Sequence, residues 1–409
     1  MTPAAHRVGL ADILRLMGPA YLATHDLSVA KTKVWRAIVA CRTAALGGHV
    51  EVCDTCGTTR HVYHSCRNRH CPLCQTRAKE AWLVQRRREL LPTPYFHLVF
   101  TLPHVLHGLV TRHPRLIYDM LFKAASGTLT EFAASARHLG GEAAFTLVLH
   151  TWKQDLGRHV HVHALVAGGA LTPAGEWVRM WRPRAICPKR GFLFPVRALS
   201  KMFRGKFVAA LTAEWTAGNL STRTADSEWQ RLKAALYAHE WVVYAKQSLG
   251  GPAQVLEYLG RYTHRVAISN ILREDATYER IVGMDHGEVA FRVRSDATSG
   301  KKRTLRLPGT EFIDRFLKHV LPTGFKRIRH YGLLAPKHKA GRLALARTAL
   351  DAPTPDPVVI ESVEAFMRRV ERIEWRACAH CGMGHFGVTG SLAPVRAPPG
   401  SSRGPPCAI

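Results

Sequence analysis

Residues 49–76 constrain the fold most, because this segment is rich in cysteine and histidine and poor in large aliphatic side chains. A segment of that composition cannot bury a core and relies on an ion or another staple for its fold. It contains Cys53-x-x-Cys56 and Cys71-x-x-Cys74, with fourteen residues between the pairs. That spacing is typical of two knuckles that present four thiolates to one Zn²⁺. The sequence therefore predicts a structural zinc site made by these four cysteines.

Neighbouring residues leave the exact set of zinc ligands open. Cys66 and His70 lie in the same segment, and either can replace a thiolate or hold a second ion. Arg67 and Arg69 place positive charge beside the thiols, which lowers the pKa of a thiol and offers contacts to phosphate. The alternative is two unrelated pairs of buried thiols.

Cysteines outside this segment are interpreted differently. Cys378-x-x-Cys381 is half of a zinc site without a partner pair, so a ligand role and a simple turn are equally compatible with it. Cys41, Cys187 and Cys407 are scattered along the chain. In a reducing compartment we expect such cysteines to be small buried hydrophobic residues.

The charge of the chain indicates the class of its partner. It has 58 Lys and Arg against 30 Asp and Glu, a net charge of +28, with 46% hydrophobic residues. The hydrophobic content excludes a wholly disordered chain. The charge favours nucleic acid, because each neutralised phosphate releases counterions. No run of eighteen apolar residues occurs, and the N-terminus has the pattern of an amphipathic helix rather than a signal peptide. We therefore expect a cytoplasmic protein with no membrane partner.

Three histidines alternate with valine in the segment HVHVHALVAGG. On a β-strand, His159, His161 and His163 project from one face while the valines pack on the other. His150 ends the preceding strand-like segment, and an antiparallel turn brings it beside His161 and His163 as a third ligand. Neighbouring imidazoles with open positions suit a divalent cation that polarises a phosphate. A polar strand face turned to solvent is the alternative.

Two tyrosines lie four residues apart in the segment LEYLGRYTHR. Tyr258 and Tyr262 therefore share one face of a predicted helix. Packing alone explains many such pairs, but Arg261 and Arg265 suit phosphate better than a core. A phenol beside a metal-bound phosphate can form a covalent phosphotyrosyl intermediate. Lys246, at the end of a predicted strand, can neutralise charge, transfer a proton or simply be solvated.

The length of the chain, 409 residues, predicts two or three domains. Hydrophobic periodicity predicts helices within 8–46 and at 77–91, 105–138, 195–237, 252–262, 311–321 and 360–376. It predicts strands at 95–102, 143–152, 159–169 and 241–246, and further short strands up to residue 308. The domains that we expect are a helical, zinc-binding DNA-binding domain (1–92), a domain with the histidine and tyrosine motifs (93–275), a basic C-terminal part (276–350), and a linker, CxxC knuckle and disordered tail (351–409).

Taken in order, the segments CRNRHCPLC, LHTWKQDLGRHVHVHALV, WVVYAKQSLGGPAQVLEYLGRYTHRVAISN and EFIDRFLKHVLPTGFKRIRHYG closely resemble the two-tyrosine HUH transposases of the insertion-sequence 91 family. The resemblance covers about residues 10–350. It implies an α+β fold, in which a helical, zinc-binding N-terminal module precedes an HUH nuclease domain, an antiparallel sheet flanked by helices, and a basic C-terminal extension follows.

The resemblance also implies roles for particular residues. His161 and His163 would bind Mg²⁺ or Mn²⁺, and Tyr258 and Tyr262 would nick single-stranded DNA. His159 leaves the register of the histidine pair open. A third ligand from the preceding strand is similar to the three-histidine arrangement of conjugative relaxases.

The function that follows is a DNA transposase that nicks and rejoins single-stranded DNA through a 5′-phosphotyrosine and mobilises an insertion sequence by a rolling-circle mechanism. Its partners would be single-stranded element ends, target DNA and the host replication machinery, and the oligomeric state stays open. One alternative is a plasmid-type rolling-circle replication initiator. Another is a non-catalytic, zinc-containing DNA-binding protein.

Overall fold

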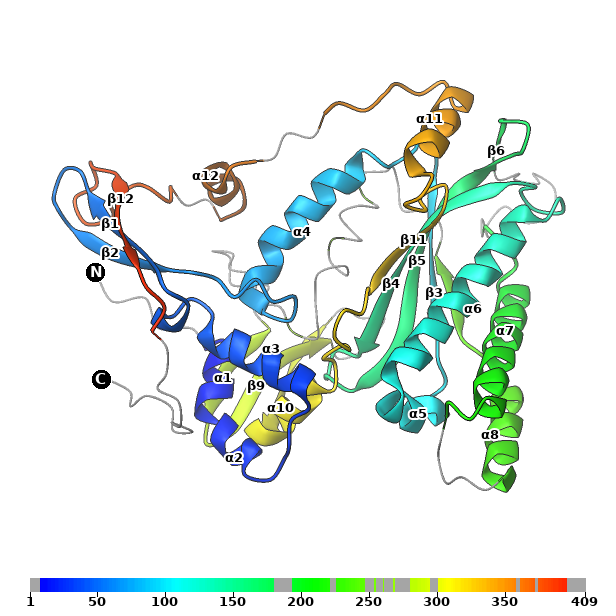
Figure 1. Ribbon diagram of the computed structural model, residues 1–409, viewed down its shortest axis with the longest axis horizontal. Coiled ribbons are helices and arrows are strands. Elements are labelled where there is room, and N and C mark those ends of the chain that lie inside the picture. Colours follow the sequence, from blue (N-terminus) through cyan, green and yellow to red (C-terminus); the bar gives the residue numbers. More distant parts are fainter. Residues whose placement is uncertain are drawn as a thin grey trace. The chain divides into compact units, whose positions relative to one another are not determined.

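The structure is a computed structural model (Figure 1). By its internal contacts the chain divides into two compact units. The cysteine unit comprises Met1–Ala78, Ile268–Val320 and Val359–Ile409, and the sheet unit comprises Lys79–Ala267 and Leu321–Val358. The residues that the structure describes are 8–179, 193–220, 226–246, 254, 260, 268, 280–294, 301–357, 361–371 and 374–395.

The sheet unit is built on an antiparallel sheet with strand order β11-β4-β5-β3-β7, and β6 pairs with β5. The two long central strands, β4 and β5, are joined by a short turn, so that residues eleven apart come to lie opposite each other. The strands are β3 (Tyr95–Thr101), β4 (Glu142–Trp152), β5 (Arg158–Leu171), β6 (Trp177–Arg179), β7 (Val243–Lys246) and β11 (Ile328–Gly332).

Helices cover one face of this sheet (Figure 1). Val160 and Val162 of β5 belong to the hydrophobic core on this side, which also contains Phe122 and Phe203. The elements on this side are η2 (His104–Leu106), α5 (His107–Arg112), α6 (Pro114–Ala134), α7 (Val196–Thr216) and α8 (Asp226–Ala238). Because side chains alternate along a strand, His161 and His163 lie on the opposite face. That face also packs Leu165 on α11 (Lys339–Ala349).

The cysteine unit contains two small three-stranded sheets and several helices. In one sheet the strand order is β12-β1-β2, and in the other it is β10-β9-β8. The strands are β1 (Gly48–Cys53), β2 (Thr59–Tyr63), β8 (Ile281–Asp285), β9 (Glu288–Arg294), β10 (Lys302–Pro308) and β12 (Phe386–Leu392). The helical elements are α1 (Leu10–Leu16), α2 (Gly18–Leu22), α3 (Val29–Ala40), η1 (Ala44–Leu46), α10 (Gly309–Leu317), α12 (Val363–Phe366) and the π-helical η3 (Met367–Glu371), and α4 (Pro72–Arg87) continues from this unit into the sheet unit.

The α+β fold class with its antiparallel sheets is confirmed, and the C-terminal segment needs correction. We expected residues 351–409 to form a separate linker, knuckle and tail. Instead β12 pairs with β1, with Cys53 opposite Phe386. The sequence could not reveal this pairing, because β12 has a mostly exposed, glycine-containing pattern and its partner lies far away in the chain. The helix expected over 360–376 is interrupted: α12 and η3 cover 363–371.

Two further expectations concern residues that lie outside the described part of the chain. The helix predicted over 252–262 falls there except for Gln254 and Gly260, which are both helical. The tail beyond residue 395 falls there as well. Among the described residues, no helix has the length and apolar content that crossing a membrane requires.

Candidate metal centres

Three buried imidazoles meet on the face of the large sheet opposite the α6 and α7 helices. Strand register places His150 of β4 directly opposite His161 of β5, with His163 two residues further along. His161 Nε2 lies 3.1 Å from His163 Nε2, which in turn lies 3.1 Å from His150 Nδ1. All three side chains are at least nine-tenths buried. We call this group the histidine centre.

The spacing of these nitrogens fits an octahedral cation. Ligands about 2.1 Å from such a cation stand about 3.0 Å apart when they are adjacent. Burial, and then repulsion from His159, lower the pKa of His161 to about 3, and burial also holds the pKa of His163 well below its usual value. At neutral pH these rings are therefore uncharged, and their lone pairs can bind a cation.

His97, a residue that sequence reasoning missed, holds one of these rings in place. Its Nε2 lies 2.8 Å from His163 Nδ1, and the two rings stack with centroids 5.1 Å apart. Because Nδ1 of His163 is engaged in this way, Nε2 is the atom that faces the other two histidines. The available signal was a histidine inside the otherwise apolar strand YFHLVFT.

His159 lies beside the histidine centre and outside its group of converging nitrogens. Its ring centroid is 4.8 Å from that of His161, and its backbone oxygen is 2.9 Å from His161 Nδ1. That oxygen can only accept, so Nδ1 of His161 donates and Nε2 carries the lone pair. Of the two registers that the sequence left open, the structure brings together His161 and His163.

Four thiols gather near the start of α4, and we call them cysteine cluster 1. Cys74 Sγ lies 3.6 Å from Cys41 Sγ and 3.7 Å from Cys66 Sγ, and Cys71 completes the group. Four sulfurs about 2.3 Å from a tetrahedral Zn²⁺ stand about 3.8 Å apart. The amide of Cys66 donates to Cys41 Sγ at 3.4 Å, and the N-terminus of α4 favours thiolates at Cys71 and Cys74.

A second group of four thiols, cysteine cluster 2, combines Cys53 and Cys56 with Cys378 and Cys381. Cys53 Sγ lies 3.8 Å from Cys381 Sγ, and Cys56 Sγ lies 3.7 Å from Cys378 Sγ. All eight clustered cysteines are free of disulfides. The described part of the chain thus holds two groups of thiols with tetrahedral spacing.

The expected single site of Cys53, Cys56, Cys71 and Cys74 does not form in the structure. Cys53 ends β1, whereas Cys66 follows the end of β2, which pairs with the opposite end of β1 at Gly48. Five residues of extended strand, about 17 Å, therefore separate the two locations. Each location instead takes its other two thiols from elsewhere: Cys41 and Cys66 join Cys71 and Cys74, whereas Cys378 and Cys381 join Cys53 and Cys56.

Three other cysteine-region predictions have clear outcomes in the structure. Cys41 was expected to be a scattered hydrophobic residue, and this is wrong because it belongs to cluster 1. Cys66, the possible extra ligand, is a member of the same cluster, whereas His70 lies outside it, with Nδ1 3.1 Å from Asn68 Oδ1. Arg67 and Arg69 are exposed beside the cluster. Cys187 and Cys407 lie outside the described residues.

The predicted nucleophiles, Tyr258 and Tyr262, lie outside the described residues, as do Arg261 and Arg265. Between the two tyrosines in sequence, Gly260 is described and buried. A Cβ atom at Gly260 would stand 2.9 Å from Leu83 Cδ1, so this helical residue packs closely on the part of α4 that belongs to the sheet unit. Lys246 ends β7, where it pairs with His97 in the strand register.

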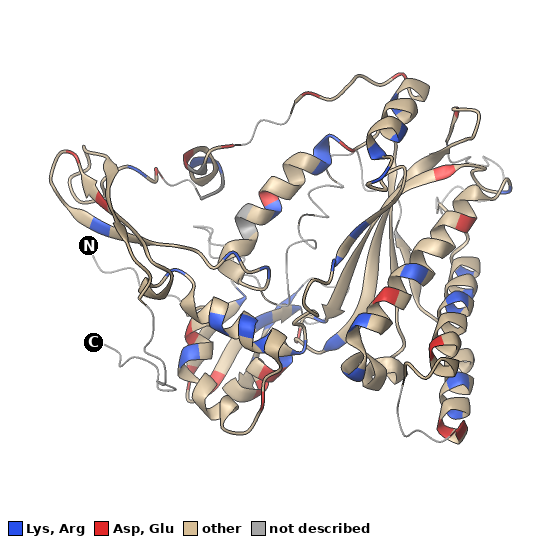
Figure 2. Ribbon diagram, viewed as in Figure 1, with Lys and Arg blue, Asp and Glu red and all other residues tan. Residues whose placement is uncertain are grey.

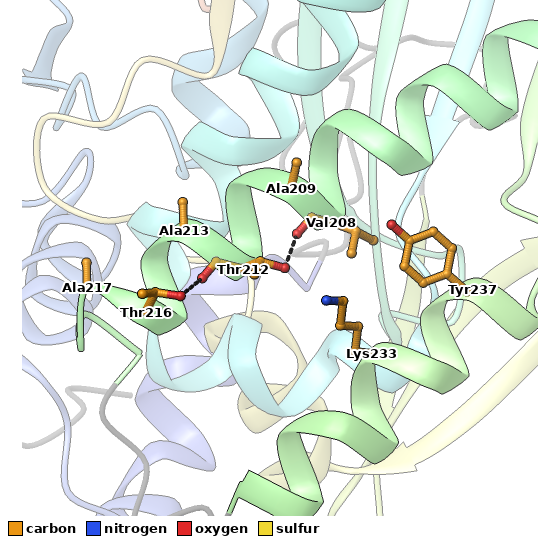
Figure 3. A pocket seen from close by; sticks show the side chains of 8 residues that line it. All are labelled: Val208, Ala209, Thr212, Ala213, Thr216, Ala217, Lys233 and Tyr237. Atoms are coloured by element: carbon orange, nitrogen blue, oxygen red, sulfur yellow. Dashed lines mark hydrogen bonds between the residues drawn. The ribbon is translucent and has the colours of Figure 1, made fainter.

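A pocket of about 720 Å³ lies between α7 and α8, apart from the histidine centre (Figure 3). Lys233 and Tyr237 of α8 face small residues of α7 across it. The hydroxyls of Thr212 and Thr216 donate to carbonyls of their own helix. With one amine, one phenol and no acidic residue in its lining, the pocket lacks the ligands of a metal site.

Comparisons with known proteins identify the family. A family model described as a putative transposase matches residues 144–341, and another described as a transposase zinc-binding domain matches residues 13–102. The chain is 43% identical over 386 residues to a protein named putative transposase y4qJ from Sinorhizobium fredii (strain NBRC 101917 / NGR234), which covers 92% of this chain and 93% of that protein. The chain belongs to the insertion-sequence 91 family of transposases.

A more distant relative supports the same family. This transposase is 26% identical over 351 residues to the transposase for insertion sequence element IS801 of Pseudomonas savastanoi pv. phaseolicola, over 84% of this chain and 80% of that protein. No solved structure matches the chain. The zinc-binding match contains all of cluster 1 and half of cluster 2, and it supports a structural zinc ion. The putative-transposase match contains the histidine centre.

Proposed function

We propose that this transposase nicks and rejoins single-stranded DNA at the histidine centre, with Tyr258 and Tyr262 as nucleophiles, and moves an insertion sequence by a rolling-circle mechanism. The observation that carries the proposal is the convergence of three buried imidazoles within a family of transposases. His150, His161 and His163 are the residues that would hold Mg²⁺ or Mn²⁺, which supplies positive charge at the scissile phosphate.

The protein residues then have defined tasks. His97 fixes the ring of His163 through the 2.8 Å contact, so that the ligand nitrogen needs no reorientation during the reaction. The phenolic oxygen of Tyr258 or Tyr262 attacks the phosphorus, and the bond from phosphorus to the 3′ oxygen breaks. That oxygen takes up a proton and leaves as a free 3′-OH, while the 5′ phosphate stays on the tyrosine. The second tyrosine can cut another strand, whose 3′-OH reverses the first step.

Contacts to DNA phosphates would come from basic surfaces. Figure 2 shows Lys and Arg spread over α3, α4, α7 and α8. In the small sheet of the cysteine unit, Arg292 and Arg294 of β9 share one face with Lys302 and Arg306 of β10. Lys302 stands directly opposite Arg294, so basic side chains of both strands gather on this face. A surface of this kind suits contacts to the phosphates of a DNA backbone.

The cellular setting follows from the same proposal. DNA in bacteria lies in the cytoplasm, and host polymerases would extend the free 3′-OH. Single-stranded element ends and target sites would be the substrates, held chiefly through phosphates and shape.

The test is a covalent-trapping assay with a labelled single-stranded oligonucleotide that carries an element end. The wild-type chain with Mn²⁺ should yield a protein–DNA adduct that survives denaturing electrophoresis. Tyr258→Phe and Tyr262→Phe together should abolish the adduct while oligonucleotide binding persists, because only the nucleophilic oxygens are removed. Tyr237→Phe is the matched control, since this exposed tyrosine of α8 lies in the separate pocket.

Three outcomes would overturn the proposal. An adduct that persists in the double variant shows that another nucleophile acts. Binding without any adduct in the wild-type chain, with a competent element end, supports a zinc-containing DNA-binding protein without nuclease activity. An adduct formed on a plasmid origin in preference to an element end supports a replication initiator instead.

A further inference from the structure

The second cysteine cluster brings together parts of the chain that neither family match joins. Cys53 and Cys56 lie within the match to the zinc-binding domain, whereas Cys378 and Cys381 lie beyond both matches. More than three hundred residues separate the two pairs in sequence. The C-terminal pair therefore adds two thiols to a site of which the zinc-binding match contains only half.

The two pairs form the same turn. Each reads Cys-x-x-Cys-Gly, and the closing glycines, Gly57 and Gly382, both have φ of +72°, a conformation that favours glycine. The amide of Gly57 donates to the carbonyl of Cys53 at 3.1 Å, and the amide of Gly382 donates to that of Cys378 at 2.9 Å. This repeated turn is the knuckle that a tetrahedral thiolate site requires twice.

The sulfur positions fit an ion and not a disulfide. The sulfur–sulfur distances between the pairs, 3.7 and 3.8 Å, match the edge of about 3.8 Å expected around Zn²⁺ and far exceed the length of about 2.05 Å of a disulfide. The amide of Gly384 also donates to Cys381 Sγ at 3.3 Å, as amides around metal-bound thiolates do. Cys53 and Cys378 are fully buried.

The backbone of the C-terminal knuckle lies directly on the N-terminal one. A Cβ atom at Gly384 would stand 2.5 Å from Cys53 Sγ, so only glycine fits there. The amide of His385 donates to Asp54 Oδ1 at 2.8 Å, and the amide of Asp54 donates to the carbonyl of His385 at 3.1 Å. These contacts hold the four sulfurs together on a rigid backbone frame.

Strand pairing by itself gives this junction little stability. Along β12 only Phe386 is buried, and it packs with Cys53 and Cys378 in a small cluster. Arg60 adds its guanidinium over the Phe386 ring at 3.9 Å and donates to the carbonyl of Trp375. Apolar burial of this size contributes little to the stability of the junction, whereas the binding free energy of a structural zinc ion adds directly to the folding free energy.

We propose that Cys53, Cys56, Cys378 and Cys381 bind a second Zn²⁺ that fastens the C-terminal strand β12 to the N-terminal hairpin β1–β2. The transposase then holds two structural zinc ions, one in each cysteine cluster. The hairpin of the N-terminal module is completed only when the chain includes residues near 374–392. This site is independent of the nuclease mechanism, because it contains none of the proposed nuclease residues.

The zinc content of the purified full-length chain tests the proposal. Mass spectrometry of the metal should give two zinc ions per chain, and Cys378→Ser with Cys381→Ser should give one. Gly384→Val keeps all four thiols and should also lose about one ion, because its side chain enters the space of Cys53 Sγ. Met383→Ser is the matched control, since this side chain of the same knuckle is 75% exposed, and it should keep two.

If a variant unfolds and loses all its zinc, alkylation of the wild-type chain still tests whether Cys378 and Cys381 bind zinc. In the zinc-loaded wild-type chain, Cys378 and Cys381 should resist iodoacetamide and should react after chelation. One zinc ion per chain in both wild type and the Cys378→Ser, Cys381→Ser variant would overturn the proposal. Rapid alkylation of Cys378 in the zinc-loaded wild-type chain would overturn it too.

Discussion

The cysteine clusters and the histidine centre differ in how much hydrophobic core surrounds them. Around cysteine cluster 2 the buried apolar residues amount to Cys53, Cys378 and Phe386. The histidine centre lies on a sheet whose other face buries Val160, Val162 and many aromatic residues. The comparison teaches that the β1–β2–β12 sheet has little core of its own and would depend on the proposed zinc ions, whereas the core of the large sheet positions the histidine centre.

The two kinds of site also differ in how many coordination positions of a bound ion the protein would fill. Each cysteine cluster offers four thiols, a closed set for a tetrahedral ion. The histidine centre offers three nitrogens with spacing for an octahedral ion, which leaves positions for phosphate oxygens and water. Closed sets are typical of structural sites and open sets of catalytic ones.

Removal of zinc should produce the largest effect, and it should affect the cysteine unit while leaving the sheet unit folded. A strong chelator, or Cys53→Ser with Cys56→Ser, should unfold the β1–β2–β12 sheet, since on the order of 10 kcal/mol of folding free energy is lost. Hydrogen exchange should rise sharply in β1 and stay unchanged in β4 and β5, which are held by the hydrophobic core. An unchanged melting profile after chelation contradicts the comparison.

Loss of the histidine centre should have the opposite effect: it should reduce DNA cleavage and leave the fold and the zinc content intact. His161→Ala with His163→Ala should lower metal-dependent cleavage of a single-stranded oligonucleotide about a thousandfold or more, because the cation that offsets charge on the phosphate is no longer held. Zinc content and melting temperature should remain close to those of the wild type. A loss of zinc in this variant would place these histidines in a structural site instead.

A smaller effect is expected at His97. His97→Ala should weaken Mn²⁺ binding about 10- to 100-fold, because the ring of His163 loses the contact that orients it. His97→Gln should restore part of the affinity, since an amide can still hydrogen-bond to Nδ1 of His163. Isothermal titration of the zinc-loaded chain measures both. Equal affinities in wild type and His97→Ala would show that His97 only fills space.

The smallest effect concerns His330, a half-buried histidine of the same sheet that lies outside the histidine centre. The guanidinium of Arg86 can only donate, so Nε2 of His330 accepts at 3.2 Å, and Nδ1 donates to Thr146 Oγ1. Burial, then Arg86 and Lys339, lower the pKa of His330 to about 4. The unfolded chain therefore binds the extra proton first, between pH 6.5 and 4.

Stability of the sheet unit should consequently fall as the pH drops through that window and should be level above it. The slope from this one group is at most about 1.4 kcal/mol per pH unit. His330→Gln should flatten the dependence, as measured by urea denaturation at pH 4.5, 5.5 and 7. A wild-type slope that the substitution leaves unchanged would assign the dependence to other groups.

The sequence by itself determined the features that depend on near neighbours. Alternation along one strand placed His161 and His163 on the same face, and a short turn brought His150 opposite them, because both follow from the two-residue period of a strand. The Cys-x-x-Cys knuckles were equally local. Runs of apolar residues with clear periods predicted where strands and helices lie, whereas the antiparallel sheet with its flanking helices was implied by the resemblance to the family.

The tertiary structure alone decided which distant groups share a site. Cys53 and Cys71 were assigned to one ion because they are close in sequence, but a strand of extended chain holds them apart. Cys41 and Cys378 were brought in by helix and strand packing, and His97 by the pairing of β3 with β5. Spacing along a chain reports local geometry, whereas such groupings depend on how separate segments pack, and no local pattern of residues encodes that.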